Sequence, residues 1–153
     1  MKITTNHFGE LQIPDENIIT FENGIPGFLD YTKYIIINDE EEDSPFCWLQ
    51  SIEEPDLAFA LVNPYLVHED YNPNLPKGEV EKLGEGTDKD YSILSIVTVP
   101  EDMEKMTANL TAPIVINLKT KKATQMIIDG NDYPIKYYLF NQLQKRLEKK
   151  KAK

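Results

Sequence analysis

The feature that most constrains the fold of this chain is a series of short runs rich in β-branched and aromatic residues, each bounded by turn residues. About ten such runs occur at close spacing, whereas stretches with helical periodicity are few. This spacing predicts a mainly β chain that folds as a single-domain antiparallel barrel or sandwich. The predicted strands are Lys2–Thr5, Glu10–Ile13, Ile18–Phe21, Tyr34–Ile37, Phe46–Ile52, Leu57–Val62, Ile93–Val99, Ile114–Leu118, Ala123–Ile128 and Pro134–Tyr137.

Two places in this series carry a further signal. Lys2–Thr5 and Glu10–Ile13 flank the sequence Asn-His-Phe-Gly, which predicts a hairpin. Ile93–Val99 is apolar on both alternating faces, a pattern that indicates a central strand. Pro100 ends this strand because proline has no N–H to donate to a ladder.

Two segments depart from the strand pattern. Pro76–Leu83 predicts one or two helical turns, with Gly84 as the stop signal. Residues 137–149 predict a C-terminal α-helix, whose narrow apolar face is formed by Leu139, Phe140, Leu143 and Leu147. We expect this helix to pack at its start and to project or fray at its end. The chain thus divides into a β domain over residues 1–144 and a basic helix end or tail over residues 145–153.

The segment FENGIPGF, residues 21–28, concentrates two glycines, a proline and two phenylalanines. No helix pattern follows it, which argues against a phosphate-binding loop. Pro26 and Gly27 fit the central positions of a type II turn, in which glycine takes a positive φ. We expect Phe21 and Phe28 to fold toward each other and to anchor a rigid loop that also contains Gly24. Ile25, at the first corner of the turn, is expected to matter less for stability than Gly27 unless its side chain is itself a contact.

Charge is unevenly distributed along the chain. The formal net charge is −10, and residues 145–153 carry +5, so that residues 1–144 carry −15. An acidic surface repels nucleic-acid phosphates and anionic lipids, and it suits either a basic protein partner or solubility alone. We therefore expect no direct nucleic-acid binding and no membrane binding. Residues 1–20 lack a signal-peptide pattern, which predicts a cytoplasmic protein.

The sequence predicts no catalytic residue, no cofactor and no metal site. Cys47 is the only cysteine, and its apolar neighbours indicate a small buried thiol. A nucleophilic pair of Cys47 with His68 stays an open alternative, while His7 is expected at the surface. The acidic run Asp39–Asp43 lacks the ligand spacing of a calcium loop, so we interpret it as a solvated loop.

Four segments, in this order, resemble the FliW family of flagellar assembly factors. Gly24–Phe28 resembles the family's G-[LI]-P-G-F signature, and Phe46–Ser51 resembles its W-L-Q-S strand. Leu57–Pro64 resembles its A-F-x-V-x-x-P stretch. Val97–Asn117 resembles V-T-V-P followed by M-T-A-N-L-x-A-P-I-x-I-N, and Gln125 also fits. The resemblance runs over roughly residues 1–140.

The resemblance implies a cytoplasmic bacterial regulator with a β-barrel-like fold, and not an enzyme. Members of this family bind flagellin and also bind CsrA, a small RNA-binding dimer that represses translation. When flagellin has been exported, the free FliW protein captures CsrA and relieves the repression of flagellin messenger RNA. What is known of the family favours non-competitive antagonism, in which FliW binds CsrA outside its RNA site. The other possible mechanism is direct competition, in which the acidic surface mimics RNA. A flagellin export chaperone without CsrA antagonism is the alternative function.

The resemblance leaves open which residues touch a partner. Trp48, Phe59 and Ile114 are expected in the core. Polar side chains beside the predicted turns are expected to be exposed, which makes them candidates for partner contact. These candidates are Gln50, Asn63 and Asn109.

Overall fold

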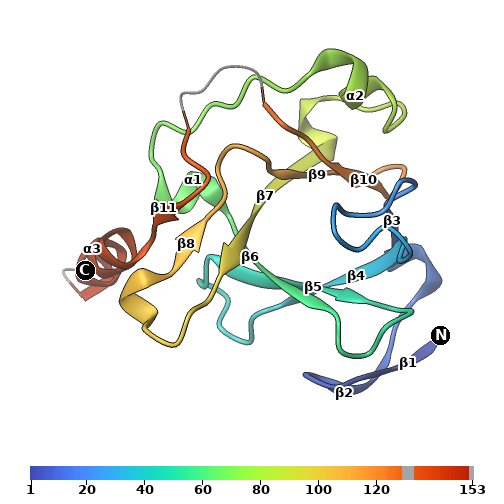
Figure 1. Cartoon of the computed structure of the whole chain (residues 1–153), viewed down its shortest axis with the longest axis horizontal. Helices are drawn as coiled ribbons and strands as arrows, with labels where there is room; N and C mark the ends of the chain where they lie inside the picture. The colour runs from blue at the N-terminus through green and yellow to red at the C-terminus, as the bar shows by residue number, and fades with distance from the viewer. Residues whose placement is uncertain (129–132, 152–153) are drawn as a thin grey trace.

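The structure is a computed structural model that describes residues 1–128 and 133–151 (Figure 1). The strands are β1 (Lys2–Thr5), β2 (Gly9–Gln12), β3 (Ile19–Thr20), β4 (Lys33–Asn38), β5 (Phe46–Ser51), β6 (Ala58–Val62), β7 (Tyr91–Thr98), β8 (Thr107–Ala108), β9 (Ile114–Asn117), β10 (Lys122–Gln125) and β11 (Tyr137–Tyr138). The α-helices are α1 (Pro64–Val67), α2 (Lys77–Glu81) and α3 (Phe140–Lys151). Short 3₁₀ turns are η1 (Asp15–Asn17), η2 (Asp88–Asp90) and η3 (Met103–Lys105).

Seven strands of the main sheet close into a barrel. Strands β3 to β7 are neighbours in chain order, β7 also pairs with β9, and β10 joins β9 to β3. Strands β8 and β11 extend the sheet from β7 on the side of the barrel that carries α3 (Figure 1). The prediction of a mainly β, barrel-like fold with a C-terminal helix is thus confirmed.

The prediction of a wholly antiparallel sheet needs one correction. Strand β3 pairs with β10 in parallel, with Thr20 opposite Lys122, and the Thr20 N–H donates to the carbonyl of Lys121 at 2.8 Å. The other pairings between the described strands are antiparallel. A tight hairpin forces neighbouring strands to run antiparallel, and no hairpin connects these two strands.

Strand β7 is central, as its sequence predicts. It pairs with β6, β8 and β9, and it ends at Thr98 before Pro100. Strand β10, by contrast, ends at Gln125 instead of Ile128, because the amides of Met126 and Ile128 donate to the 111–113 loop. The short strand β8 was not predicted, and β11 replaces the predicted strand Pro134–Tyr137.

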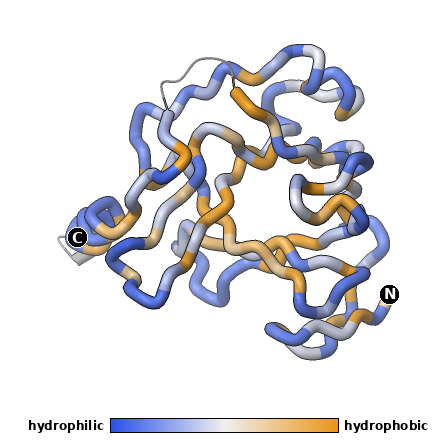
Figure 2. Tube along the Cα trace, in the orientation of Figure 1, coloured by the Kyte–Doolittle hydropathy of each residue, from blue (hydrophilic) through white to orange (hydrophobic). Residues whose placement is uncertain are grey.

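The interior of the barrel is apolar, and the tube in Figure 2 is largely orange along the strands that surround it. Its buried residues are Ile19, Phe21, Ile25, Tyr34, Cys47, Leu49, Leu61, Ile114, Ile116 and Ala123. Ile114 is therefore in the core, as expected. Trp48 and Phe59 are only half-buried, and Trp48 packs edge-to-face on Phe8 at 5.8 Å.

Two further clusters attach the outer elements to the barrel. The predicted hairpin of β1 and β2 is confirmed, and its Ile3 and Ile13 pack on Ile35 of β4. On the opposite side, α1, β8 and the start of α3 share a second core that includes Val67 and Leu139. The barrel therefore has a separately packed element at each side.

The helices follow the sequence signals with small shifts. Helix α2 follows Pro76, and Gly84 has φ +96° at the predicted stop. Helix α3 begins at Phe140 because the residues before it pair with β8. Leu139 is buried and Leu147 is 52% exposed, which confirms packing at the start of the helix alone. Of the predicted tail, residues 152–153 lie outside the described residues.

Candidate protein-interaction surfaces

The loop that follows β3 is built from consecutive tight turns. The Gly24 N–H donates to the carbonyl of Phe21 at 2.9 Å, and the Phe28 N–H donates to the carbonyl of Ile25 at 2.7 Å. Gly27 has φ +89° after Pro26, which confirms the predicted type II turn. Gly24 also has a positive φ of +69°, and a Cβ at this position would lie 2.7 Å from the backbone of Leu29. The backbone of this loop therefore disfavours any residue other than glycine at positions 24 and 27.

Side chains from this loop point both into and out of the barrel. Phe21 and Ile25 are buried in the barrel core, where Phe21 packs edge-to-face on Tyr34 at 5.2 Å. Phe28 is 39% exposed and packs on Phe59 at 5.3 Å. The prediction that the two phenylalanines fold toward each other is wrong, because each ring has its own partner. Ile25, only 1% exposed, is the apolar anchor of the turn, and this burial argues against the expectation that it matters less than Gly27.

The turn between β5 and β6 supports the loop from beside it. One carboxylate oxygen of Glu53 accepts the N–H groups of Thr32 and Lys33 at 2.7 and 2.9 Å. Gln50 is fully buried beneath the same turn, and its amide nitrogen donates to the carbonyls of Ser51 and Leu57 at 2.9 and 3.1 Å. The expectation that Gln50 is exposed is therefore wrong. The turn folds over this side chain and uses its amide as an internal brace.

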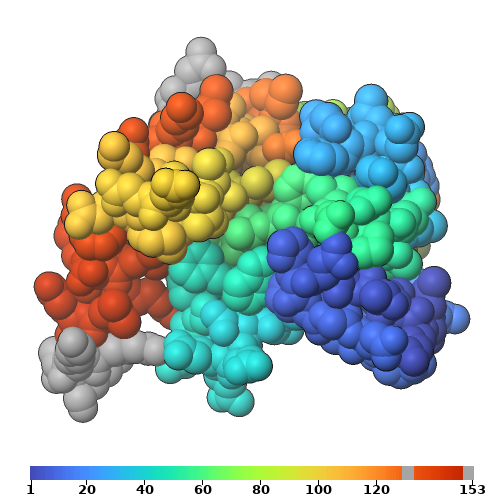
Figure 3. Space-filling view, turned by 60° about the horizontal axis from the view of Figure 1, so that its bottom comes forward, coloured from blue at the N-terminus to red at the C-terminus, as the bar shows by residue number. Residues whose placement is uncertain are grey.

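We call the surface formed by residues 21–33 and 52–57 the loop end. It carries five carboxylates against the ammonium group of Lys33. Phe28 and Leu29 project from it, and Leu29 is 64% exposed. Figure 3 shows the blue loop, the green turn and the dark-blue N-terminal hairpin as one continuous surface, with α3 at the other side. The loop end thus combines a rigid apolar tip with negative charge.

Little of this negative charge is neutralised by ion pairs between described residues. Between described residues, ion pairs join Glu22 to Lys122, Glu10 to Lys2, and Asp15 to the N-terminal amine. Glu22 is the one loop-end acid among these three. Since the other carboxylates of the loop end form no ion pair with a described residue, their field extends into solvent and favours a basic partner.

The remaining two candidate contact residues organise the local backbone. The side-chain oxygen of Asn63 accepts the Tyr65 N–H at 3.0 Å and caps helix α1. The side-chain oxygen of Asn109 accepts the N–H groups of Thr111 and Ala112 at 3.0 Å. Both asparagines are half-buried rather than exposed. Contact of either side chain with a partner stays a prediction.

A second surface lies on the other side of the barrel, between α1 and α3. A hollow of about 620 Å³ separates the two helices there, and we call it the helix groove. Sequence periodicity did not reveal it, because α1 is only four residues long. Its lining residues are Asp43, Tyr65, Leu66, Val67, Glu69, Gln142, Lys145, Arg146 and Lys149.

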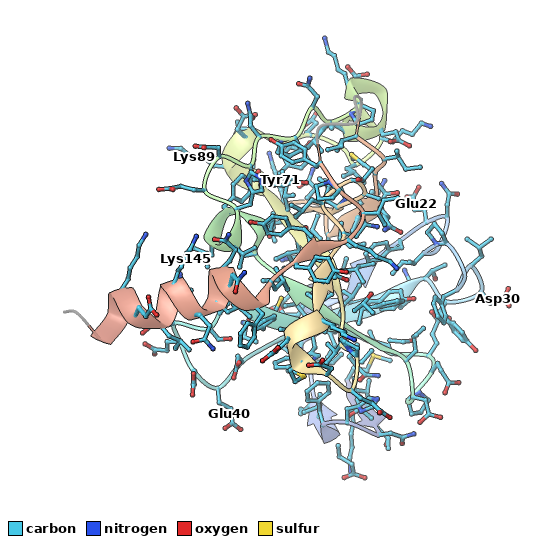
Figure 4. The ribbon with its side chains drawn as sticks, turned by 60° about the vertical axis from the view of Figure 1, so that its left-hand side comes forward. Glu22, Asp30, Glu40, Tyr71, Lys89 and Lys145 are labelled. Carbon is cyan, nitrogen blue, oxygen red and sulfur yellow. The ribbon has the colours of Figure 1, made fainter. Side chains whose placement is uncertain are left out.

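Aromatic side chains hold α1 against the segment that precedes α3. The Tyr137 hydroxyl donates to the carbonyl of Val67 at 3.1 Å, and the Tyr71 hydroxyl donates to the carbonyl of Leu110 at 2.8 Å. The His68 ring packs on the rings of Tyr133 and Tyr137. Tyr71, labelled in Figure 4, therefore lies within a cluster that fixes one wall of the helix groove.

The predicted buried thiol is confirmed. Cys47 lies in the barrel core, and burial raises the pKa of its thiol to about 11. His68 packs in the separate aromatic cluster, so the structure does not bring the two together as a nucleophilic pair. Among the described residues no group of histidine, cysteine or carboxylate side chains could hold a metal ion, and no helix is long and apolar enough to cross a membrane.

Comparisons with known proteins agree on one family. The family model for the FliW protein matches residues 2–139. The flagellar assembly factor FliW of Alkaliphilus metalliredigens (strain QYMF) is 46% identical, with 97% of this chain and 91% of that protein covered. The flagellar assembly factor FliW of Ruminiclostridium cellulolyticum (strain ATCC 35319 / DSM 5812 / JCM 6584 / H10) is 41% identical, with coverage of 95% and 99%. A crystal structure of the flagellar assembly factor FliW superposes with a TM-score of 0.82 at 34% identity, over 92% of this chain and 97% of that one.

Proposed function

This chain belongs to the FliW family of flagellar assembly factors, and we propose that it is a cytoplasmic regulator of flagellin synthesis. In this proposal the protein binds flagellin, and when it is free of flagellin it binds the translational repressor CsrA. Binding prevents CsrA from repressing flagellin messenger RNA. Because the matched relatives are assembly factors, we infer that this chain acts by binding proteins and not as an enzyme.

One observation about the loop end supports a basic partner such as CsrA. The loop end presents Phe28 and Leu29 on a rigid backbone among carboxylates that lack ion pairs with described residues, apart from Glu22. Carboxylates in such an arrangement speed the encounter with a basic protein, and exposed apolar side chains then supply contact area. The same charges repel nucleic acid, which makes direct binding to the messenger unfavourable.

The loop end also bears on how CsrA is antagonised. A mimic of RNA would compete at the RNA site through negative charge alone. The two exposed apolar side chains of the loop end have no counterpart in a phosphate backbone. This difference supports a non-competitive route, in which the protein binds CsrA outside its RNA site and weakens RNA binding from there.

The first test compares two leucine substitutions at opposite sides of the molecule. Leu29→Ser removes an exposed apolar side chain of the loop end, and Leu147→Ser makes the same change on α3, where Leu147 is 52% exposed. We expect Leu29→Ser to weaken CsrA binding about tenfold and Leu147→Ser to leave it unchanged. Calorimetric titration with purified CsrA measures both. Equal effects of the two substitutions would contradict the assignment of the loop end.

Two further measurements separate the alternatives. If no complex with CsrA forms at micromolar concentration while flagellin still binds, the protein is a flagellin chaperone without CsrA antagonism. In the non-competitive route, adding the protein to a preformed complex of CsrA with leader RNA accelerates RNA release while rebinding is blocked. An unchanged RNA dissociation rate supports direct competition instead.

A further inference from the structure

The helix groove differs in charge from the rest of this acidic protein. Lys145, Arg146 and Lys149 line its α3 wall, and Glu69 and Asp43 also belong to its lining. Neither Lys145 nor Lys149 forms an ion pair with a described residue. The groove lining thus holds three cations against two carboxylates, whereas the whole chain has a net charge of −10, so its α3 wall attracts negative charge.

The cations of the groove belong to one face of α3. Gln142, Lys145, Arg146 and Lys149 follow the spacing i, i+3, i+4, i+7, which places them together on a helix surface. Their length along the helix axis is about 10 Å, or roughly two turns. Figure 4 shows α3 extending away from the barrel with Lys145 along it, on the side opposite Asp30.

The opposite wall of the groove is apolar and held in place. Tyr65 and Leu66 on α1 are 44% and 43% exposed, whereas Val67 in the same helix is buried. Asn63 caps the helix, and the ring of Tyr65 packs edge-to-face on Tyr71 at 5.6 Å. Because these contacts fix the wall before anything binds, little ordering entropy opposes a ligand.

We propose that the helix groove binds an acidic amphipathic helix of a partner protein. The apolar side of such a helix packs on Tyr65 and Leu66, while carboxylates spaced i, i+4 on its edge face Lys145 and Lys149. A hollow of about 620 Å³ accepts several side chains of such a helix. The inference goes beyond the proposed function, because the site lies across the barrel from the loop end and has the opposite charge. It also lies partly on α3, beyond the residues that the family model matches.

Other occupants fit the groove less well. A phosphate backbone offers no apolar side to Tyr65 and Leu66, and the net negative charge of the chain repels it. A second copy of the chain offers its acidic Asp39–Asp43 loop. That loop is already tied to its own helix, since Arg146 donates to the carbonyl of Asp43 at 2.7 Å. Both occupants are outcomes of the experiment below.

The experiment uses the full chain and a designed helical peptide of about 16 residues, or roughly four turns. Leucines on one face and glutamates on the flanking edges make the peptide amphipathic. A scrambled peptide has the same composition without the periodicity, and a third peptide carries lysine in place of glutamate. We expect fluorescence anisotropy to show binding of the first peptide at least tenfold tighter than either of the others.

Matched variants locate the site. Lys145→Glu with Lys149→Glu reverses the charge of the α3 wall, and Leu66→Ser removes part of the apolar wall. We expect each to weaken peptide binding about tenfold, whereas Lys89→Glu and Leu29→Ser, at residues that do not line the groove, leave it unchanged. Melting curves check that every variant is folded.

Several results would overturn the proposal. Equal binding of the scrambled peptide shows attraction by charge alone, and loss of binding in Lys89→Glu shows that the groove is not the site. Displacement of the peptide by a short RNA at equal concentration assigns the groove to nucleic acid. If the chain forms a dimer in sedimentation experiments, and the double substitution Lys145→Glu with Lys149→Glu abolishes that dimer, the groove binds a second copy of the chain instead.

Discussion

The loop end and the helix groove place the residues proposed for partner contact on different kinds of support. At the loop end, exposed Phe28 follows buried Ile25 within one tight turn, so residues for folding and residues for contact alternate along the chain. At the groove, Lys145 and Lys149 lie on α3, which packs through Leu143 in its first turn and through Leu139 just before it. Substitutions at the loop end therefore affect stability and binding together, while those in α3 separate the two.

The largest difference is expected from a pair of apolar truncations. Ile25→Ala leaves a cavity in the barrel core, which costs about 2–5 kcal/mol of unfolding free energy. Leu66→Ala, at a side chain that is 43% exposed in the groove, should cost under about 1 kcal/mol. Denaturant unfolding measures both. Equal costs would show that the loop is not anchored through Ile25.

A glycine pair tests the backbone of the loop end. In Gly24→Ala the new Cβ meets the Leu29 backbone at 2.7 Å and also takes a positive φ, so we expect a loss on the order of 3 kcal/mol. In Gly27→Ala the space around the Cβ is open and only the φ of +89° is unfavourable, which costs about 1 kcal/mol. At roughly 2–4 °C per kcal/mol, melting temperatures resolve the two. A larger shift for Gly27→Ala would contradict this account of the turn.

A glutamine pair compares the internal brace with the groove surface. Gln50→Leu removes the donor that holds the β5–β6 turn and leaves the carbonyls of Ser51 and Leu57 without it, at a cost of about 1–3 kcal/mol. Gln142→Leu on α3 should change stability by about 0.5 kcal/mol or less. Hydrogen exchange adds a local readout, since the Thr32 and Lys33 amides depend on the same turn. Unchanged exchange at these amides would show that Gln50 does not support the loop end.

The smallest expected effect concerns the link between α3 and the acidic loop. Arg146→Ala removes an exposed hydrogen bond to the carbonyl of Asp43, which contributes about 0.5 kcal/mol. We expect faster amide exchange in residues 39–43 and an unchanged melting temperature. Lys145→Ala serves as the control, because Lys145 forms no ion pair with a described residue. A clear fall in melting temperature for Arg146→Ala would show that α3 supports the fold.

Local sequence signals predicted the parts of the structure that depend on neighbouring residues. Strand spacing indicated the barrel, and Pro26 with Gly27 indicated the type II turn. Gln50 was predicted to be exposed because it is a polar residue beside a turn, yet it is buried at the end of β5. The turn formed by residues 52–57 covers Gln50, and this tertiary contact leaves no sign in the local sequence pattern.

The misassigned roles within the loop have a similar cause. Turn chemistry fixes the path of the backbone, but it does not say which apolar side chain enters the barrel. Ile25 does so and Phe28 does not, because the loop lies across the barrel with Ile25 against its core. The helix groove escaped prediction because α1 is short, and its position beside α3 depends on pairing of β11 with β8.

The parallel contact between Thr20 and Lys122 has a consequence for the order in which the protein folds. The strands from β4 to β7 pair with neighbours that follow one another along the chain, whereas β3 and β10 bring together residues about a hundred positions apart. The entropic cost of closing such a loop rises with the logarithm of that separation. Closure therefore comes late, and the joint is the first to reopen. Pulsed hydrogen exchange during refolding should protect the amides of β4 and β5 before that of Thr20. Simultaneous protection would mean that the barrel closes as it collapses.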